Sequence, residues 1–368
     1  ELYVLVSSKV RKISGGIITT AAGNGSFGFG GDGGPASAAQ LYSPRGIALN
    51  PAGELIIADY SNSRIRKVTT AGVINTVAGN GRSLTVDYGD GGDALEATFA
   101  TISAVTSDTS GNIYIADANA NVIRRVDGTT GIITRFAGIG SAGYFGDGGP
   151  ATSAALSGPS SISFDGAGNL YIGESGSDHV RKVSPSGIIT TVAGGGIGGP
   201  GDGGPATAAV FSADGVAADA AGNIYIADNV AKRLRRVDAA TGIITTVAGN
   251  DTATTPGDGG PATAAALAHA YGVSFDRAGN IYVGGNQVRK ITPSGIISTI
   301  PIWGQTVAVD TMGNIYTNYG TRILRYDIYK YISRIAGNGT SGYSGDNGPA
   351  SAASLAGSGG QICIDKQG

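Results

Sequence analysis

The sequence predicts an all-β fold, a seven-bladed β-propeller of four-stranded blades. Three observations predict it. One unit recurs along all 368 residues, each unit carries four short strand signals, and the two chain ends together complete one unit. Self-similarity at a period of tens of residues is typical of repeat architectures, in which each repeat buries its apolar surface against its neighbours. We expect one domain over residues 1–368.

The recurring unit is recognised first by the motif G-N-I-Y-I-A-D. Its clearest copies are residues 111–117 and 222–228, and variants start at Gly53, Gly168, Gly279 and Gly313. A seventh copy is divided between the chain ends, because residues 362–368 open it and residues 1–5 continue it. We therefore expect the two ends to pair in one sheet and close the ring, which removes exposed sheet edges. A six-bladed ring and an open array are the alternatives.

Four strands are expected in each unit. In the first complete unit they cover residues 46–49, 55–58, 64–68 and 73–77, with Gly, Pro, Asn and Asp between them. The second strand is apolar on consecutive residues, which indicates burial on both faces of its sheet. Sheets that pack face to face around an axis have this pattern.

Composition excludes several classes of protein. The net charge is −2, and most of the 25 Lys and Arg residues lie on the third strand of each unit, so they form no single basic patch. No run of 18 apolar residues occurs, so we expect no membrane insertion. The single cysteine, Cys363, is expected in a core. Because the chain starts without Met or a signal peptide, we expect a processed form or part of a longer protein.

An insert of about twenty residues follows six of the seven units. Its core is G-D-G-G-P-A-S-A-A at residues 31–39, and it returns at residues 89–94, 146–152, 201–207, 257–263 and 345–351. The unit that ends at Ile300 lacks it. The pattern predicts a tight Gly loop and then Pro at the first position of a short helix. We expect the inserts to form a crown on one face, where binding function would lie.

Two sets of candidate site residues lie in or beside these inserts. Calcium is the first candidate ligand, and the alternative is that each aspartate braces its own loop, since calcium needs several oxygens. The calcium candidates are Asp32, Asp147, Asp202, Asp258 and Asp346. Three Asn-x-Ser/Thr sequons are candidate glycosylation sites, and the alternative is that A-G-N-G is repeat consensus followed by a chance Ser or Thr. The sequon asparagines are Asn24, Asn250 and Asn338.

No catalytic or cofactor-binding residue is predicted. Acidic residues end the second strand of four units, and we expect them to pair with the third-strand cations; they are Asp59, Asp117, Glu174 and Asp228. The two histidines, His179 and His269, have no His or Cys at ligand spacing, and we expect both in surface loops.

The unit P-x-G-I-A, G-N-x-Y-I-A-D, R-I-R-K-V, G-I-I-T-T-V-A-G resembles the NHL repeat, and the inserts resemble its long-loop version. The resemblance covers essentially the whole chain. It implies a β-propeller that binds protein, glycan or nucleic acid, as found in many secreted or surface proteins. Family propellers are commonly six-bladed, whereas seven units are counted here. Some relatives are lyases or lactonases with His or acidic metal ligands in a central channel, and no matching cluster is found here.

The function predicted from these features is a non-enzymatic extracellular or cell-surface module for adhesion, recognition or assembly, such as a structural part of a larger surface or filament protein. Its expected partners are other proteins or copies of itself, with glycans as a further class. The alternative from another class is a metal-dependent lyase or lactonase that uses the central channel. A nucleic-acid-binding platform is disfavoured by the acidic pI of about 5.7.

Overall fold

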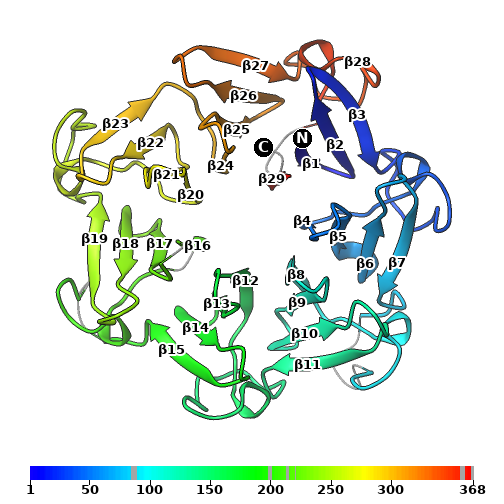
Figure 1. The fold of residues 1–368 in the computed structure, drawn as a ribbon, viewed down its shortest axis with the longest axis horizontal. Coiled ribbons are helices and arrows are strands. Elements are labelled where there is room, and N and C mark those ends of the chain that lie inside the picture. Colours follow the sequence, from blue (N-terminus) through cyan, green and yellow to red (C-terminus); the bar gives the residue numbers. More distant parts are fainter. Residues whose placement is uncertain (84–88, 198–200, 213–214, 220, 357–360, 366–368) are drawn as a thin grey trace. The chain divides into compact units, whose positions relative to one another are not determined.

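A computed structural model describes residues 1–83, 89–197, 201–212, 215–219, 221–356 and 361–365. Within these residues the strands form seven antiparallel sheets, and the fold is a seven-bladed β-propeller (Figure 1). The chain divides into two compact units. One comprises Glu1–Ile162, Gly320–Arg322 and Ile335–Gly368, and the other comprises Ser163–Tyr319 and Ile323–Arg334.

Six blades are each built from four strands that are consecutive in sequence and adjacent in the sheet. They are β4 (Gly46–Leu49), β5 (Leu55–Asp59), β6 (Arg64–Val68) and β7 (Ile74–Ala78); β8 (Ile102–Ser107), β9 (Ile113–Asp117), β10 (Val122–Val126) and β11 (Ile133–Ala137); β12 (Pro159–Phe164), β13 (Leu170–Glu174), β14 (His179–Val183) and β15 (Ile189–Ala193); β16 (Gly215–Ala218), β17 (Ile224–Asp228), β18 (Arg233–Val237) and β19 (Ile244–Ala248); β20 (Val273–Phe275), β21 (Ile281–Val283), β22 (Val288–Ile291) and β23 (Ile297–Ile300); β24 (Val307–Val309), β25 (Ile315–Tyr319), β26 (Arg322–Tyr326) and β27 (Ile332–Ala336).

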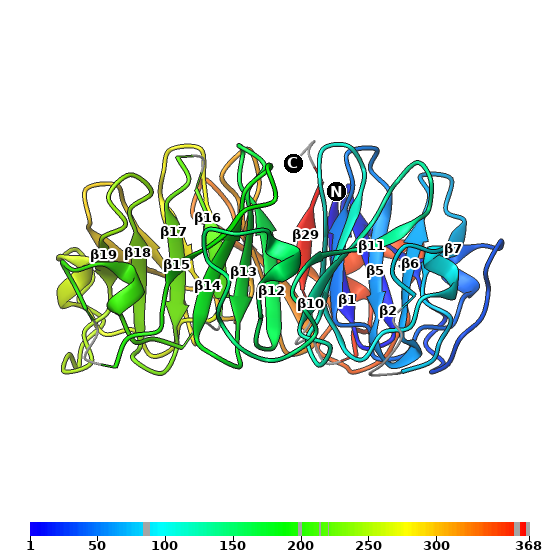
Figure 2. The ribbon, with the colours of Figure 1, turned by 90° about the horizontal axis from the view of Figure 1, so that it is seen from below.

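The remaining blade, here called the terminal blade, joins the two chain ends as predicted. Its order is β28 (Gly348–Pro349), β3 (Ile17–Ala22), β2 (Lys9–Ser14), β1 (Leu2–Val6) and β29 (Ile362–Ile364). Strand β29 pairs antiparallel with β1, with Leu2 opposite Ile364 (Figure 2). The Glu1 ammonium lies 2.8 Å from Asp365 Oδ1, which adds an ion pair to the ladder. The last three residues of the seventh motif copy, 366–368, lie outside the described residues.

The second strand of each blade is the most buried, and its neighbours in the core come from two blades. Every residue of β5, β9, β13 and β17 is buried. One core cluster contains Leu5 and Val10 of the terminal blade together with Ile47 and Ile57 of the β4–β7 blade. The continuous apolar runs therefore have the physical cause that was predicted, burial on both faces of the sheet.

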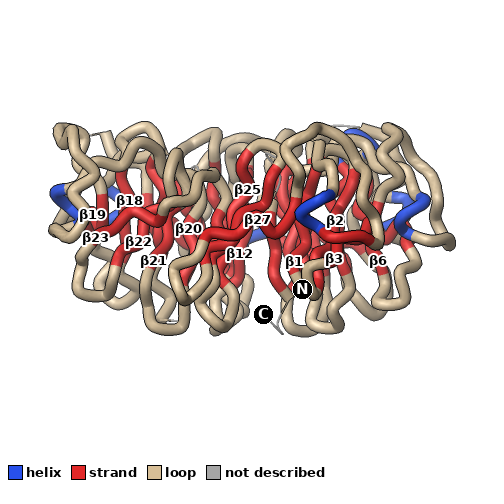
Figure 3. The backbone as a smooth tube through the Cα atoms, turned by 90° about the horizontal axis from the view of Figure 1, so that it is seen from above, coloured by secondary structure: helices blue, strands red, loops and turns tan. Residues whose placement is uncertain are grey.

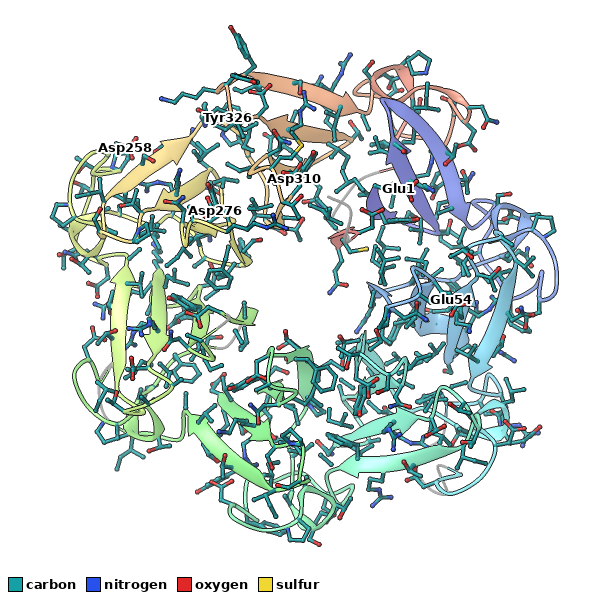
Figure 4. All side chains as sticks on the ribbon, in the orientation of Figure 1. Glu1, Glu54, Asp258, Asp276, Asp310 and Tyr326 are labelled. Carbon is teal, nitrogen blue, oxygen red and sulfur yellow. The ribbon has the colours of Figure 1, made fainter. Side chains whose placement is uncertain are left out.

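The G-N-x-Y motif holds the turn between the first and second strands. In the β20–β23 blade, Asp276 accepts hydrogen bonds from the Asn280 backbone and side chain at 2.9 and 2.7 Å, and from the Tyr282 hydroxyl at 2.9 Å (Figure 4). Asp310 makes the equivalent bonds in the β24–β27 blade. Burial alone would raise the pKa of Asp276, but these bonds keep it below its usual value.

Helix in the described residues is confined to single 3₁₀ turns between strands (Figure 3). The insert turns are η1 (Ala36–Ala38), η3 (Ala94–Glu96), η4 (Ala151–Ser153), η5 (Ala206–Ala208), η6 (Ala262–Ala264) and η7 (Ala350–Ala352), and η2 (Tyr60–Asn62) follows β5. Pro35 precedes η1 at the N-cap with φ −60°. The prediction that proline takes the first helical position was therefore wrong by one residue. Among the described residues, no helix is long and apolar enough to cross a membrane.

Candidate functional site

Each insert that can be traced within one compact unit lies along the edge of the blade that follows it. Gly33 N donates to Ile74 O at 2.9 Å, Ile74 N donates to Gly34 O at 3.1 Å, and Ala36 N donates to Gly72 O at 2.8 Å. In the terminal blade the same contact forms a fifth strand, β28. The prediction of a crown on one face was wrong, because these inserts extend the ladder of the following blade by main-chain hydrogen bonds and cover its edge strand.

An ion pair between the insert and the third strand fixes this arrangement. Arg66 of β6 is fully buried, and its Nη2 lies 2.6 Å from Asp32 Oδ1. The other oxygen of Asp32 accepts a hydrogen bond from Thr76 of β7 at 2.7 Å. A charge-assisted bond of this kind compensates for removing the guanidinium from water.

The same ion pair recurs in four other blades. Its distances are 2.8 Å for Arg11–Asp346, 2.8 Å for Arg124–Asp90, 2.7 Å for Arg235–Asp202 and 2.9 Å for Arg289–Asp258. Burial lowers the pKa of Arg11, Arg124 and Arg289, and the insert aspartates oppose that shift. Figure 4 shows Asp258 in its insert, next to β23, where Thr299 Oγ1 donates to it at 3.0 Å.

Four of the five calcium candidates thus have their carboxylates bonded to arginine and threonine. Asp147, the fifth, lies at the same place in the insert before η4. These four carboxylates therefore do not brace their own loops. Each of them holds its insert to the following blade. Among the described residues, no three His, Cys, Asp or Glu side chains gather as a metal site would require. Calcium would have to share these carboxylates with arginine, and its binding stays a prediction.

The acids that end the second strands accept hydrogen bonds from backbone amides, and two of them also pair with a third-strand arginine as expected, Asp59 with Arg66 and Glu174 with Arg181 at 3.8 Å. Asp59 accepts from Tyr42 N at 2.8 Å and from Asn62 Nδ2 at 2.8 Å, whereas its nearest guanidinium atom, on Arg66, is 3.5 Å away. Asp117 accepts from Thr101 N at 2.6 Å. Burial raises the pKa of both aspartates, although these bonds oppose the shift. These carboxylates anchor the segment that leads into the first strand.

The two histidines differ in burial and in their contacts. His179 is the first residue of β14 and is buried, with Nδ1 2.6 Å from Ser177 O, so the surface-loop prediction was wrong for it. His269 is half-buried, and its ring stacks on Tyr271 at a centroid distance of 5.3 Å. Its Nδ1 lies 3.0 Å from Asn229 Oδ1.

A cavity of about 460 Å³ lies between the β12–β15 and β16–β19 blades. Its charged lining is Asp165, Lys182 and Asp238. Asp165 already accepts bonds from the Asn169 backbone and side chain at 2.9 and 2.7 Å. Asp238 accepts from the Thr241 backbone and hydroxyl, both at 3.0 Å, and these bonds lower its pKa. Both carboxylates hold turns of the repeat.

Exposed aromatic side chains are the feature that the sequence analysis missed. Phe27, Phe29 and Tyr42, here called the insert patch, flank the first insert and have exposed fractions of 61%, 43% and 44%. The rings of Phe27 and Tyr42 are 5.5 Å apart. Large apolar side chains gathered on a surface mark interaction sites. The signal in the sequence was the F-G-F triplet inside an otherwise small-residue loop.

The sequons lie where each insert begins. Asn24 is exposed, and Asn250 and Asn338 are half-buried. Asn24 Nδ2 donates to Ala38 O at 3.1 Å, and Asn338 Nδ2 donates to Ala352 O at 3.0 Å. Asn80, which is not in a sequon, makes the same bond to Glu96 O at 2.9 Å. These asparagines therefore have a structural role in the repeat, and glycosylation stays a prediction.

Part of the chain is similar in sequence to known NHL-repeat proteins. The model of the teneurin NHL domain family matches residues 25–87. Teneurin-3 of Danio rerio is 30% identical over 155 residues, which is 39% of this chain and 5% of that protein. Teneurin-1 of Caenorhabditis elegans is 32% identical over 108 residues, 27% of this chain and 4% of that protein. These matches support the NHL-repeat β-propeller that the recurring motif predicts. These alignments span only a small part of each teneurin.

Solved structures similar to this propeller include enzymes. Virginiamycin B lyase from Staphylococcus aureus has a TM-score of 0.53 at 16% identity, over 79% of this chain and 83% of that one. A streptogramin B lyase has a TM-score of 0.53 at 17% identity, over 79% of this chain and 81% of that one. At such identities the likeness shows the fold alone.

Proposed function

We propose that this NHL-repeat propeller is a non-enzymatic module that binds proteins outside the cell or at its surface. The observation that supports this most is how its charged groups are used. The buried arginines bind the insert aspartates, and the buried acids bind backbone amides, so these groups hold the scaffold. The large side chains left exposed on the first insert are aromatic. Aromatic anchors contribute much of the binding energy at protein interfaces.

The similarity to teneurins supports an adhesion-type role. The proposed partners are other proteins or copies of this chain, with glycans as a further class. Under this proposal Asn24, Asn250 and Asn338 are glycosylated when the chain passes through a eukaryotic secretory route. Intact mass of protein secreted from such cells tests this, and the expected excess disappears in the Asn24→Gln, Asn250→Gln and Asn338→Gln variant.

Adhesion of cells to the immobilised chain tests the binding function. Phe27→Ser with Tyr42→Ser should weaken adhesion by about tenfold or more, because it removes two exposed anchors from one patch. Met312→Ser, at a side chain that is 68% exposed and far along the sequence, is the matched control and should leave adhesion unchanged. Equal adhesion by all three proteins would contradict the role of the insert patch.

Metal analysis and activity assays on the same purified protein distinguish a binding module from an enzyme. Elemental analysis should find no stoichiometric metal, and lactone and cyclic ester substrates should turn over no faster than in buffer. A tightly bound metal together with turnover would replace the proposal with the metal-dependent lyase or lactonase alternative.

A further inference from the structure

One blade has an uncovered edge strand. The β24–β27 blade follows the unit that lacks an insert, and residues 301–306 lead directly from β23 to β24. Strand β27 ends its sheet, and among the described residues no backbone hydrogen bond joins Ile332 to a segment outside that sheet. An edge strand presents a row of N–H and C=O groups that can pair with another chain.

The repeats provide an internal comparison for this edge. One isoleucine recurs at or next to the start of each fourth strand, and it is 0% exposed at Ile18, Ile74, Ile133, Ile189, Ile244 and Ile297. Ile332 occupies that position in the β24–β27 blade and is 48% exposed. Beside it, Ile328, Tyr329 and Tyr331 are 51%, 75% and 71% exposed. Residues 328–334, which carry these four exposed side chains, are here called the bare edge.

A second position changes together with the missing insert. The buried arginine of the third strand, Arg66 in the β4–β7 blade, is replaced by Leu324 in the β24–β27 blade. Without an insert aspartate, a buried guanidinium there would be unpaired, which is strongly destabilising. The blade is therefore adapted to the absence of the chain's own insert, and its edge is available to a different segment.

Charge along the bare edge favours an acidic occupant. Lys330 and Arg334 are exposed, and residues 328–336 contain no acidic residue. Arg334 stands where Thr76 does in the β4–β7 blade. The same position in β11 is Arg135, whose Nε lies 3.3 Å from Asp90 Oδ2 of the second insert. The chain thus contains an example of an arginine at this position that binds the carboxylate of an extended segment.

A second copy of the chain fits the bare edge poorly. If two β27 strands paired antiparallel about Ile332, Lys330 of one copy would face Arg334 of the other. Like charges placed directly opposite each other destabilise a sheet. A segment with a carboxylate at that place would instead gain a charge-assisted hydrogen bond.

We propose that the bare edge binds an extended, acidic peptide segment of a partner protein by β-strand addition. The segment runs antiparallel to β27, pairs its backbone with Ile332, covers the tyrosines with apolar side chains and places a carboxylate on Arg334. This inference rests on the proposed binding function and gives it a site and a class of partner.

Fluorescence anisotropy with a labelled peptide tests the proposal. The probe is the sequence of residues 89–99, Gly-Asp-Gly-Gly-Asp-Ala-Leu-Glu-Ala-Thr-Phe, which already binds an edge with arginine at this position. It should bind the intact chain saturably. Arg334→Glu should weaken binding at least tenfold, and replacing the second residue of the probe with lysine should restore binding to Arg334→Glu.

Ile332→Pro removes the N–H expected to pair with the peptide and should also abolish binding. If that variant does not fold, Arg334→Glu and the charge-swapped probe still decide the outcome. Thr245→Glu, at an exposed position of β19, whose edge an insert covers, is the matched control and should bind the probe as the wild type does.

Three results would overturn the proposal: no saturable binding, equal binding by wild type and Arg334→Glu, or a concentration-dependent dimer that Ile332→Arg dissociates. The last would assign the bare edge to a second copy. If the chain supports cell adhesion but does not bind the peptide, only the proposed peptide site is contradicted. If it binds the peptide but supports no adhesion, only the proposed function is contradicted.

Discussion

Removing the Asp32 carboxylate should destabilise the propeller by about 2 kcal/mol. Arg66 is fully buried, and a hydrogen bond from a charged group contributes roughly 1.5–3 kcal/mol. The Asp32 side chain is 36% exposed, so solvent screening keeps the value away from the upper end. The other oxygens near Arg66, on Gly30, Gln40 and Asp59, are 3.3 to 3.5 Å away and replace the lost partner only weakly.

Differential scanning calorimetry measures this loss. For 368 residues that unfold together, the unfolding entropy is about 0.8 kcal/mol per kelvin. A loss of about 2 kcal/mol then lowers the Tm by about 2–3 °C in Asp32→Ala. Asp251→Ala is the control, because Asp251 is 60% exposed and 3.2 Å from Arg233, and its Tm should match that of the wild type.

A second substitution tests the physical reason. Arg66→Leu reproduces the natural change at Leu324, and in the double variant with Asp32→Ala no buried guanidinium is left without its insert carboxylate. The double variant should therefore be more stable than the sum of the single losses implies. If Asp32→Ala has the Tm of Asp251→Ala, or if the two single losses add, then the ion pair does not hold the insert as reasoned here.

Three further predictions concern particular residues. Gly79 has φ +95° and a Cβ there would meet Ser63 O, so Gly79→Ala should lower the Tm more than Gly72→Ala, where φ is +81° and the space is open; equal Tm values would contradict this. Burial raises the pKa of Cys363 to about 12, so a thiol reagent at pH 8 should label it only on unfolding, and fast labelling of the native chain would be the opposing result. Burial also raises the pKa of Asp117, so the folded state holds that proton more tightly than the unfolded state, and stability falls as the pH rises from about 4 through the raised pKa. The Tm of Asp117→Asn relative to wild type should therefore increase from pH 4 to 7. A decrease over this range would mean that the folded state lowers the pKa of Asp117.

The blade pattern was predictable from sequence because it depends on short-range periodicity. The consecutive apolar residues of β5 and β9 indicated strands buried on both faces, and the divided motif indicated that β29 pairs with β1. Both follow from burial and hydrogen bonding within one repeat, which the order of residues records directly.

The candidate site was less predictable. The aspartates of the inserts were recognised as a set, but their partners were not, since Asp32 binds Arg66 at a separation of 34 residues, in the next blade. The burial of His179 and the amide partners of Asp59 were missed for the same reason. A sequence repeat shows which residues are equivalent, whereas contacts between neighbouring blades show what each equivalent residue touches.

By itself the sequence determined the number of units, the four strands of each and the one unit without an insert. Only the tertiary structure decided that an insert covers the edge of the following blade, and hence that β27 is bare. The physical reason is that strand formation depends on local alternation and turn residues, while edge coverage depends on which segments meet in space, and a buried guanidinium is tolerated only where a carboxylate meets it.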